Sequence, residues 1–407
     1  MTNPQGYMFI SYRSTKLSAV LRLRRKLEEF GIPVWHDKDS MPPGMLEQGM
    51  IDAIRNEDCA GAIVWLSKDV TESAAIQRIE LPEILHRIQR GDEFLVVFCL
   101  TDDLTLEDAQ TVLLSSHFNV NLNSFLLHPV EAPPQEENNI KVLASLILEK
   151  RLQLIHSRLA ETETLKIHIA GHSAPPTTTK YALVVDDRPL FSGRFASEDH
   201  WQSRILPALN LIAGSIVKCA PGRTVVIDGT PQLSLALALG YAFRTPRGLR
   251  TNWLQIYPDS TSQQWGIESM SAPKDFLVER STDLLHGQDI AVLIGVTHDP
   301  EPTFDASAGR LPRFGAVIRA KPRDQKFPAT IPAGSEVSSM TQAIIREVRS
   351  ILREFRLQGS VHLFVSGPAG LLFLLGQQLN TFGKIYCYEH EALGPIGFYR
   401  LNLVMNT

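Results

Sequence analysis

The chain of 407 residues is 44% hydrophobic and 21% charged, a composition typical of a globular protein with two or three domains. Its net charge of −4 excludes the extended basic face of a protein that coats duplex DNA, but leaves room for a local basic pocket. The four cysteines form no CxxC pair, and no apolar run approaches the ~20 residues of a membrane span. We therefore expect a cytoplasmic protein with reduced core cysteines, no leader peptide and no membrane partner.

Short apolar strands and amphipathic helices alternate along the first third of the chain. The apolar runs predict strands at Met8–Ile10, Ile32–Trp35, Ala60–Leu66 and Phe94–Leu100. Helical spacing predicts helices from Leu17 to Phe30, ended by Gly31, from Leu46 to Ile54, and from Ala74 to Arg90 with Ile76, Ile79 and Leu85 facing inward. This alternation is typical of a parallel sheet covered by helices, which places the fold in the α/β class.

Two breaks in periodicity divide the chain. His128–Asn139 is rich in proline and acidic residues and predicts a loop or linker, and Ile140–Leu159 predicts a helix that closes the first domain or bridges to the next. A second break follows at Gly171–Thr179. We place the domain boundary near Ala160, which gives domains of residues 1–160 and 161–407.

The second domain contains a weak internal repeat. An apolar strand, a turn with glycine and proline, an apolar helix and a second strand occur in this order in residues 225–257 and again in residues 363–388. The strands Ala182–Val185 and Ala291–Val296, each followed by a polar turn with proline, extend the match. Two copies of one unit predict two similar α/β halves within one domain.

The turns Asp228–Pro231 and Ser366–Pro368 are candidates for binding an anion. Ligands of open α/β sheets lie at the carboxyl ends of strands, where helix N-termini present backbone N–H groups. Such a turn is also an ordinary helix start, and only its duplication favours a binding role. Candidate phosphate partners, although arginines are commonly solvated, are Lys180, Arg194, Arg244 and Arg310. The absence of GxGxxG and GxxxxGK[ST] disfavours a Rossmann dehydrogenase and a P-loop NTPase.

Catalytic and metal-binding motifs receive little support from spacing alone. His168 and His172 have the spacing of a zinc-binding helix but lack the glutamate of HExxH, so we expect no metal site. GxSxG is absent, which gives no support to a serine hydrolase. Glu80 and Glu83 lie on one face of the predicted helix, where their spacing alone favours a solvated acidic face.

Several segments of the first domain resemble a TIR domain, in the order that this family has them. Phe9–Arg13 resembles its opening box, Val34–Asp37 with Pro42–Gly44 its second strand and BB loop, and Ile63–Ser67 with Gln77–Leu81 its later strand and glutamate-containing helix. The resemblance implies a flavodoxin-like parallel sheet. The chain departs from the family before the glutamate, where Ala75 and Ile76 replace an aromatic–cysteine pair and the loop is one residue longer. Glu83 therefore remains the alternative to Glu80.

Enzymatic TIR domains cleave NAD⁺ at the nicotinamide–ribose bond, and the resemblance implies this activity here. It carries the catalytic glutamate onto Glu80, with NAD⁺ as the substrate and neither a cofactor nor a metal. The positions that it implies for the substrate pocket are Phe9, Ser11, Tyr12, Arg13, Trp35 and Asp37. Phe9 and Trp35 are equally compatible with a role as core aromatic residues.

The second domain resembles SAVED, a sensor of cyclic oligonucleotides in bacterial anti-phage (CBASS) signalling. Val226–Gly229, Phe364–Pro368 and Ile385–Glu389 carry the resemblance, which implies two fused CARF/Rossmann-like halves and a cyclic di- or trinucleotide ligand, cyclic tri-adenylate first. Residues expected at the ligand are Lys180, Arg194, Gly229, Thr230, Pro231, Thr297, His298, Ser366, Gly367, Pro368, Tyr388 and His390. Tyr388 is also compatible with packing in a buried strand.

Together the resemblances imply a TIR–SAVED effector in which a cyclic oligonucleotide switches on an NAD⁺ hydrolase. They also imply head-to-tail self-association into an oligomer or filament, with active sites completed by the BB loop, about Ser40–Leu46, of a neighbouring chain. One alternative is a TIR module that recruits other proteins without catalysis. Another is an enzyme that acts on nucleotides through the second domain, for which the sequence offers no carboxylate pair or metal set.

Overall fold

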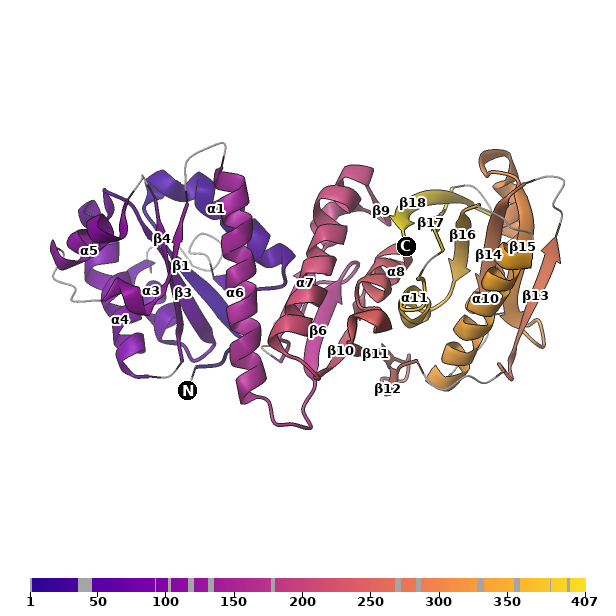
Figure 1. Cartoon of the computed structure of the whole chain (residues 1–407), viewed down its shortest axis with the longest axis horizontal. Coiled ribbons are helices and arrows are strands. Elements are labelled where there is room, and N and C mark those ends of the chain that lie inside the picture. The colour runs from indigo at the N-terminus through magenta and orange to yellow at the C-terminus, as the bar shows by residue number, and fades with distance from the viewer. Residues whose placement is uncertain are drawn as a thin grey trace. The chain divides into compact units, whose positions relative to one another are not determined.

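The computed structural model describes residues 2–35, 46–91, 93–101, 104–115, 121–130, 135–176, 180–267, 272–282, 287–327, 333–354, 359–380, 382–393 and 396–407. The chain forms two compact units (Figure 1). The first consists of Met1–Ile167, Pro175–Val185 and Lys218–Pro221; the second consists of His168–Ala174, Asp186–Val217 and Gly222–Thr407. The predicted boundary near residue 160 follows the last helix of the first unit, and it stays a prediction.

The first unit is built on a parallel sheet with the strand order β2-β1-β3-β4-β5. Its strands are β1 (Tyr7–Ser11), β2 (Val34–Trp35), β3 (Cys59–Leu66), β4 (Leu95–Leu100) and β5 (Leu126–Pro129). This is the flavodoxin-like order, which confirms the predicted fold class. The prediction of a loop from His128 was wrong at its start, because β5 is an edge strand, and an edge position tolerates Pro129.

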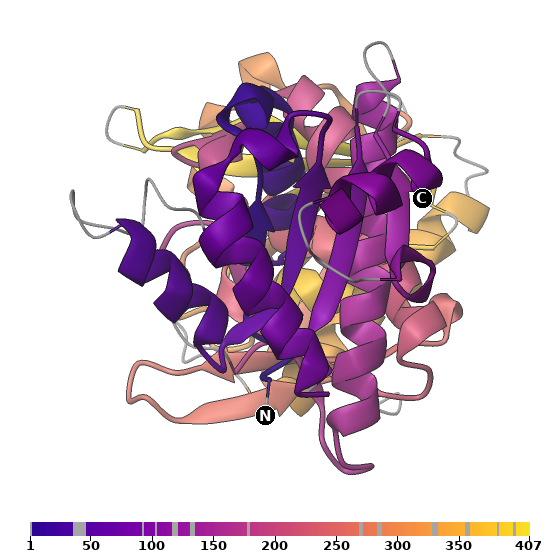
Figure 2. The same ribbon diagram turned by 90° about the vertical axis from the view of Figure 1, so that its left-hand side faces the viewer.

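Helices surround this sheet, as Figure 2 shows from the side of the first unit. They are α1 (Leu17–Glu29), α3 (Leu46–Arg55), α4 (Leu81–Gln89), α5 (Leu106–Ser115) and α6 (Glu136–Arg158), with short helical turns η1 (Ser14–Lys16), η2 (Val70–Glu72), η3 (Ile76–Glu80) and η4 (Leu122–Ser124). As predicted, Gly31 ends the first helix, with a left-handed φ of 76°. The helix α6 begins at Glu136, before the predicted Ile140, because acidic residues suit a helix N-terminus.

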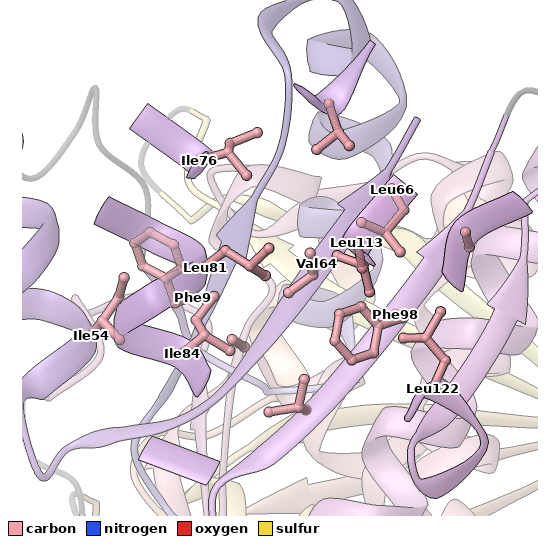
Figure 3. Close-up of a cluster of buried hydrophobic side chains, with 14 of the residues drawn as sticks. Phe9, Ile54, Val64, Leu66, Ile76, Leu81, Ile84, Phe98, Leu113 and Leu122 are labelled. Atoms are coloured by element: carbon pink, nitrogen blue, oxygen red, sulfur yellow. The ribbon is translucent and has the colours of Figure 1, made fainter. Parts of the chain in front are cut away.

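One face of the parallel sheet carries a buried core that positions the candidate catalytic helix (Figure 3). Phe9, Val64 and Phe98 of the strands pack there against side chains of the surrounding helices. The residues that η3 and α4 contribute are Ile76, Leu81 and Ile84. All four cysteines of the chain are buried and none forms a disulfide, as the sequence predicted.

The second unit is built on two sheets of similar order, although β6 and β7 begin among the residues grouped with the first unit. One has the order β12-β11-β10-β6-β7 and the other β13-β15-β14-β16-β17-β18. The first sheet contains β6 (Leu165–Ala170), β7 (Leu183–Asp186), β10 (Thr224–Thr230), β11 (Arg250–Ile256) and β12 (Ser262–Trp265). The second contains β13 (Phe276–Thr282), β14 (Asp289–Gly295), β15 (Phe314–Pro322), β16 (Val361–Ser366), β17 (Lys384–Glu391) and β18 (Phe398–Asn406).

These two orders confirm the predicted pair of similar halves. The two sheets can be aligned strand by strand, as β7-β6-β10-β11-β12 and β15-β14-β16-β17-β18. In this alignment β10 corresponds to β16 and β11 to β17, as the repeat predicted. The predicted match of Ala182–Val185 with Ala291–Val296 was wrong. The partner of β14 by position is β6, while β7 lies one strand further out, because short apolar runs do not reveal sheet order.

The remaining elements of the second unit cover these sheets or connect their strands. The helices are α7 (Leu206–Cys219), α8 (Leu233–Ala242), α9 (Glu301–Ala306), α10 (Gly334–Glu354) and α11 (Ala369–Gly376). The short elements are η5 (Arg188–Leu190), β8 (Phe191–Ser192), β9 (Phe195–Ala196), η6 (His200–Ile205), η7 (Thr245–Arg247) and η8 (Ala308–Arg310). Across the described ranges, no helix combines the length and the apolar character that a membrane span requires.

The equivalent helices α8 and α11 pack directly against each other (Figure 1). A Cβ added at Gly240 of α8 would lie 2.1 Å from the carbonyl oxygen of Phe373, and one added at Gly376 of α11 would lie 2.3 Å from that of Leu237. Backbone therefore meets backbone at the crossing. Both helices are apolar on all sides and almost wholly buried, as helices at the centre of a domain are.

We predict that Gly376→Ala or Gly240→Ala lowers the stability of the second unit by about 1–3 kcal/mol, because the two helices must move apart. Gly214→Ala in α7 is the matched control, since a Cβ there meets nothing within 4 Å. Alanine at that position should be neutral or stabilise by up to about 1 kcal/mol, since glycine is a poor helix former. Urea unfolding midpoints measure all three effects, and an equal shift at Gly214 and Gly376 would contradict the close crossing.

Candidate functional site

The candidate catalytic residues of the first unit gather at the carboxyl ends of three neighbouring strands. Ser11 ends β1 and is followed by Tyr12 and Arg13, Trp35 ends β2, and Glu80 lies in η3 beyond β3. Because β2, β1 and β3 are adjacent and parallel, these ends lie side by side, which is where open α/β sheets bind ligands. The predicted Asp37 and the BB loop about Ser40–Leu46 lie outside the described residues, except for Leu46, where α3 begins.

Glu80 is buried on the apolar side of its helix, with 7% of its surface exposed. Ile76 and Ile84, four residues before and after it, belong to the core that packs on the sheet. Glu80 is therefore not part of a solvated acidic face, which its spacing alone favoured. Leu85 is half-buried and packs against this core, as predicted. Ile79 was also predicted to face inward but is only half-buried, because η3 is a π-helical turn, which holds more residues than an α turn and shifts the inward face.

Glu83 has a different environment, at the surface between α3 and α4. Its Oε2 accepts a hydrogen bond of 2.7 Å from Arg55 Nε, and its Oε1 accepts one of 2.6 Å from Arg55 Nη2. Both carboxylate oxygens are thus engaged by one guanidinium, a geometry typical of a structural ion pair. Of the two carboxylates, Glu80 is the better candidate for chemistry.

Phe9 and Ser11 share the face of β1 against which the core helices pack, because they are two residues apart in a strand. Phe9 is fully buried and stacks on Trp35 with ring centroids 5.1 Å apart, so Phe9 is a core aromatic residue. Ser11 is also buried, and its Oγ forms no hydrogen bond with any residue that the structure describes. Since an unsatisfied buried hydroxyl costs about 1–3 kcal/mol, Ser11 is a candidate to bind substrate.

Arg13 connects the end of β1 to the segment that leads to Glu80. Its Nε donates to Asp69 Oδ2 at 3.3 Å, and its Nη2 donates to Glu72 Oε2 at 3.2 Å. Hydrogen bonds from Ser67 and Arg13 hold the pKa of Asp69 below its usual range. Arg13 therefore orders η2, which contacts η3, whereas Tyr12 is half-buried beside it.

A pocket of about 560 Å³ lies in the second unit, between the two halves. Predicted ligand residues that line it are Arg194, Pro231, Thr297, His298, Ser366, Gly367 and His390. Most of them lie at or just beyond the carboxyl ends of β10, β14 and β16, together with the first residues of α8 and α11, Leu233 and Ala369. Arg194 instead lies between β8 and β9, and His390 lies within β17. The duplicated turns thus meet around one space.

Other predicted ligand residues do not line this pocket. Three of them belong to the same turns, namely Gly229, Thr230 and Pro368. Gly229 has a φ of 134°, and a Cβ there would lie 2.0 Å from the carbonyl oxygen of Ile169 in β6, so the position requires glycine. Lys180 is grouped with the first unit. Tyr388 is buried, stacks on Phe364 at 4.5 Å and donates from its hydroxyl to His362 Nδ1, or accepts from it, at 3.0 Å. Packing is therefore the role its position supports.

Several pocket residues were not singled out from the sequence. The most informative are His172, which follows β6, Asp299, Tyr399 and Glu389, which precedes His390 on β17. Strand alternation was a usable signal for Glu389, since a residue next to a buried Tyr388 points to the opposite face. His172 was set aside with His168, but His168 Nδ1 lies 2.6 Å from Asp228 Oδ1, whereas His172 lines the pocket.

The charges of the pocket suit an anionic ligand with polar edges. Arg194 lines the pocket, and its charge adds to the effect of burial in lowering the pKa of His172. Glu389 is 1% exposed, and burial raises its pKa. Its Oε1 accepts hydrogen bonds from the backbone N and the hydroxyl of Ser234, which together with the charge of Arg194 oppose that rise.

Comparison with known families gives one match for each unit. Residues 8–125 match the TIR domain family, and residues 215–400 match the family SAVED, the SMODS-associated and fused to various effectors sensor domain. The first unit thus contains a TIR domain and the second a SAVED domain. These matches bear out the resemblances that short sequence motifs indicated.

Two curated relatives and a solved structure are similar to this chain. The chain is 24% identical over 204 residues to CD-NTase-associated protein 4 of Enterobacter hormaechei, and 25% over 197 residues to that of Moraxella osloensis. These matches cover 50% and 46% of this chain, but only 40% and 38% of the relatives' own length. An Acinetobacter baumannii Cap4 SAVED/CARF-domain containing receptor, solved with the cyclic trinucleotide 3′3′3′-cAAA, has the same fold with a TM-score of 0.50, at 14% identity, over 97% of this chain and 100% of its own.

We predict that Arg194→Gln raises the pKa of His172, because it removes a positive charge that disfavours the protonated imidazole. NMR titration of the histidine ring signals measures the shift. His362 is the internal control, since burial lowers its pKa and Arg194 does not contribute. If the pKa of His172 stays as constant as that of His362, the charge of Arg194 does not act on the pocket.

Proposed function

We propose, from the premise that the chain joins a TIR domain to a SAVED sensor domain, that it is an NAD⁺ hydrolase switched on by a cyclic oligonucleotide and acting in anti-phage defence. Cleavage of the bond between nicotinamide and ribose C1′, followed by attack of water, would give nicotinamide and ADP-ribose. NAD⁺ is the substrate in this reaction, and no cofactor is required.

The buried carboxylate of Glu80 is the observation that carries the catalytic part of the proposal. Nicotinamide leaves as a neutral molecule from a positively charged precursor, so no general acid is needed to protonate it. The developing oxocarbenium ion does need negative charge, which a carboxylate fixed near the carboxyl ends of β1 and β3 can supply in a site of low dielectric constant. A purely structural acid would be more stable at the surface, as Glu83 is.

Ser11 and Arg13 support Glu80 in different ways. The unsatisfied hydroxyl of Ser11 is placed to bond a ribose hydroxyl or phosphate of the substrate. Arg13, held by Asp69 and Glu72, orders the segment before η3 and so positions Glu80. Trp35, stacked on the buried Phe9, offers an aromatic surface for a planar ring.

The pocket of the SAVED domain supports the sensor part of the proposal. It borders the N-terminus of α11, whose backbone N–H groups favour phosphate, and it holds the cation of Arg194. The A. baumannii receptor of the same fold was solved with 3′3′3′-cAAA, and we propose cyclic tri-adenylate as the activator here. We further propose that the activated chain works in the cytoplasm and self-associates head to tail, so that a neighbouring chain completes the active site.

The experiment is NAD⁺ consumption by the purified chain with cyclic di-, tri- and tetranucleotides, each added separately. We expect NAD⁺ loss only with one ring, and a fall in kcat of about 100-fold or more in Glu80→Gln. Glu83→Gln is the matched control three residues away. It should retain nearly full activity, because the ion pair with the exposed Arg55 contributes little.

Other outcomes would support other functions of this chain. Ligand binding without NAD⁺ loss would favour the recruiting module, and loss of the cyclic nucleotide itself would favour an enzyme in the second domain. Activity that survives in Glu80→Gln but not in Glu83→Gln would move the catalytic role to Glu83.

A further inference from the structure

The two halves of the SAVED domain contact each other's helices at equivalent positions but with different side chains. Ser234 is the second residue of α8, and Gly370 is the second residue of α11. The strand β17 contacts α8 through Glu389, whose Oε1 accepts from Ser234 N at 2.8 Å and from Ser234 Oγ at 2.9 Å. The equivalent strand β11 contacts α11 through Trp253, whose Cδ1 would lie 2.4 Å from a Cβ at Gly370.

This difference leaves the two helix N-termini electrostatically unequal. The carboxylate of Glu389 already neutralises the partial positive charge at the start of α8. At the start of α11 the corresponding place holds an indole ring, and no acidic side chain of the described residues hydrogen-bonds there. Both starts border the same pocket, through Leu233 and Ala369.

Glu389 is held in place and is not a mobile surface acid. Asn402 Nδ2 donates to Ser234 Oγ at 2.7 Å and to the carbonyl oxygen of Arg194 at 3.0 Å, so β18 supports the same cluster. Oε1 accepts the two hydrogen bonds from Ser234, and the backbone N–H of Leu233 also hydrogen-bonds the carboxylate. A carboxylate can accept about four hydrogen bonds, so Glu389 keeps acceptor capacity toward the pocket that it lines. A fixed carboxylate in the wall of a pocket for a polyanion repels phosphate, but it is a strong acceptor for N–H and O–H groups.

We infer that the pocket binds its ligand in one orientation, with a phosphate at the start of α11 and an N–H or O–H donor of the same ligand on the carboxylate of Glu389. This inference rests on the proposed cyclic-oligonucleotide sensor and names its specificity-determining residue. The donor is a base amino group or a ribose hydroxyl, chemical groups that a cyclic adenylate carries together with its phosphates. The pocket is built from two equivalent halves, but each half binds a different chemical group of the ligand.

The test is isothermal titration calorimetry of the full chain with 3′3′3′-cyclic tri-adenylate. Glu389→Gln keeps the side-chain size but removes the charged acceptor, and it should weaken binding about tenfold or more. A mere structural role predicts the opposite, since removing a negative charge near a polyanion leaves affinity equal or makes it tighter. Equal or tighter binding by Glu389→Gln would therefore overturn the inference.

Two aspartate variants test the other helix start without relying on Glu389. Ala369→Asp and Leu233→Asp place a carboxylate at the first residue of α11 and α8, where helices accept acidic residues. We expect Ala369→Asp to lower affinity about 100-fold and Leu233→Asp much less, because α8 already carries an acid. Equal losses would overturn the single orientation.

Ligand analogues identify the donor. A ring with purine in place of adenine removes the amino group, and a 2′-deoxy ring removes the hydroxyl. The analogue that lacks the donor should bind the unaltered chain weakly and should lose no further affinity with Glu389→Gln. Failure of the unaltered chain to bind any cyclic di-, tri- or tetranucleotide would instead overturn the proposed sensor function, and this inference with it.

Discussion

The backbone crossing of α8 and α11 is the constraint on which the SAVED pocket depends. Gly240 and Gly376 let the two helices approach until each glycine meets a carbonyl oxygen of the other helix. The helices are equivalent elements of the two halves, so their crossing brings the turns before them, which carry Pro231 and Gly367, to one pocket. A side chain at either glycine would separate the halves and widen the site. Packing at the centre of the fold therefore sets the geometry of ligand binding.

Both candidate sites use the same property of α/β sheets, but they place charge differently. In the TIR domain, a π-helical turn sets Glu80 among apolar residues, where its carboxylate is little screened by water. In the SAVED domain, Glu389 is as deeply buried, but hydrogen bonds from Ser234 hold it at a helix start. A buried carboxylate is costly in either place, and in each the cost is consistent with a role at a ligand.

Helices and strands with a local apolar pattern could be predicted from the sequence. Strand order, helix orientation and contacts between distant residues could not, because they depend on long-range packing. The strands β1 to β4 and the repeat of residues 225–257 in residues 363–388 were predicted correctly, because apolar runs of strand length alternate there with helices. The edge strand β5 was missed because prolines break its pattern, and the inward position of Glu80 was missed because a π turn shifts the helix face. The contact of Glu389 with Ser234 joins residues far apart in the chain and leaves no local signal.

We propose that occupancy of the SAVED pocket controls NAD⁺ cleavage at Glu80. The most direct test compares the unaltered chain with Arg194→Gln in NAD⁺ cleavage at increasing concentrations of cyclic tri-adenylate. Because Arg194 lines the pocket and belongs to the SAVED domain, its loss should raise the half-activating concentration about tenfold or more and leave the maximal rate unchanged. An unchanged half-activating concentration, with or without a lower maximal rate, would contradict the account.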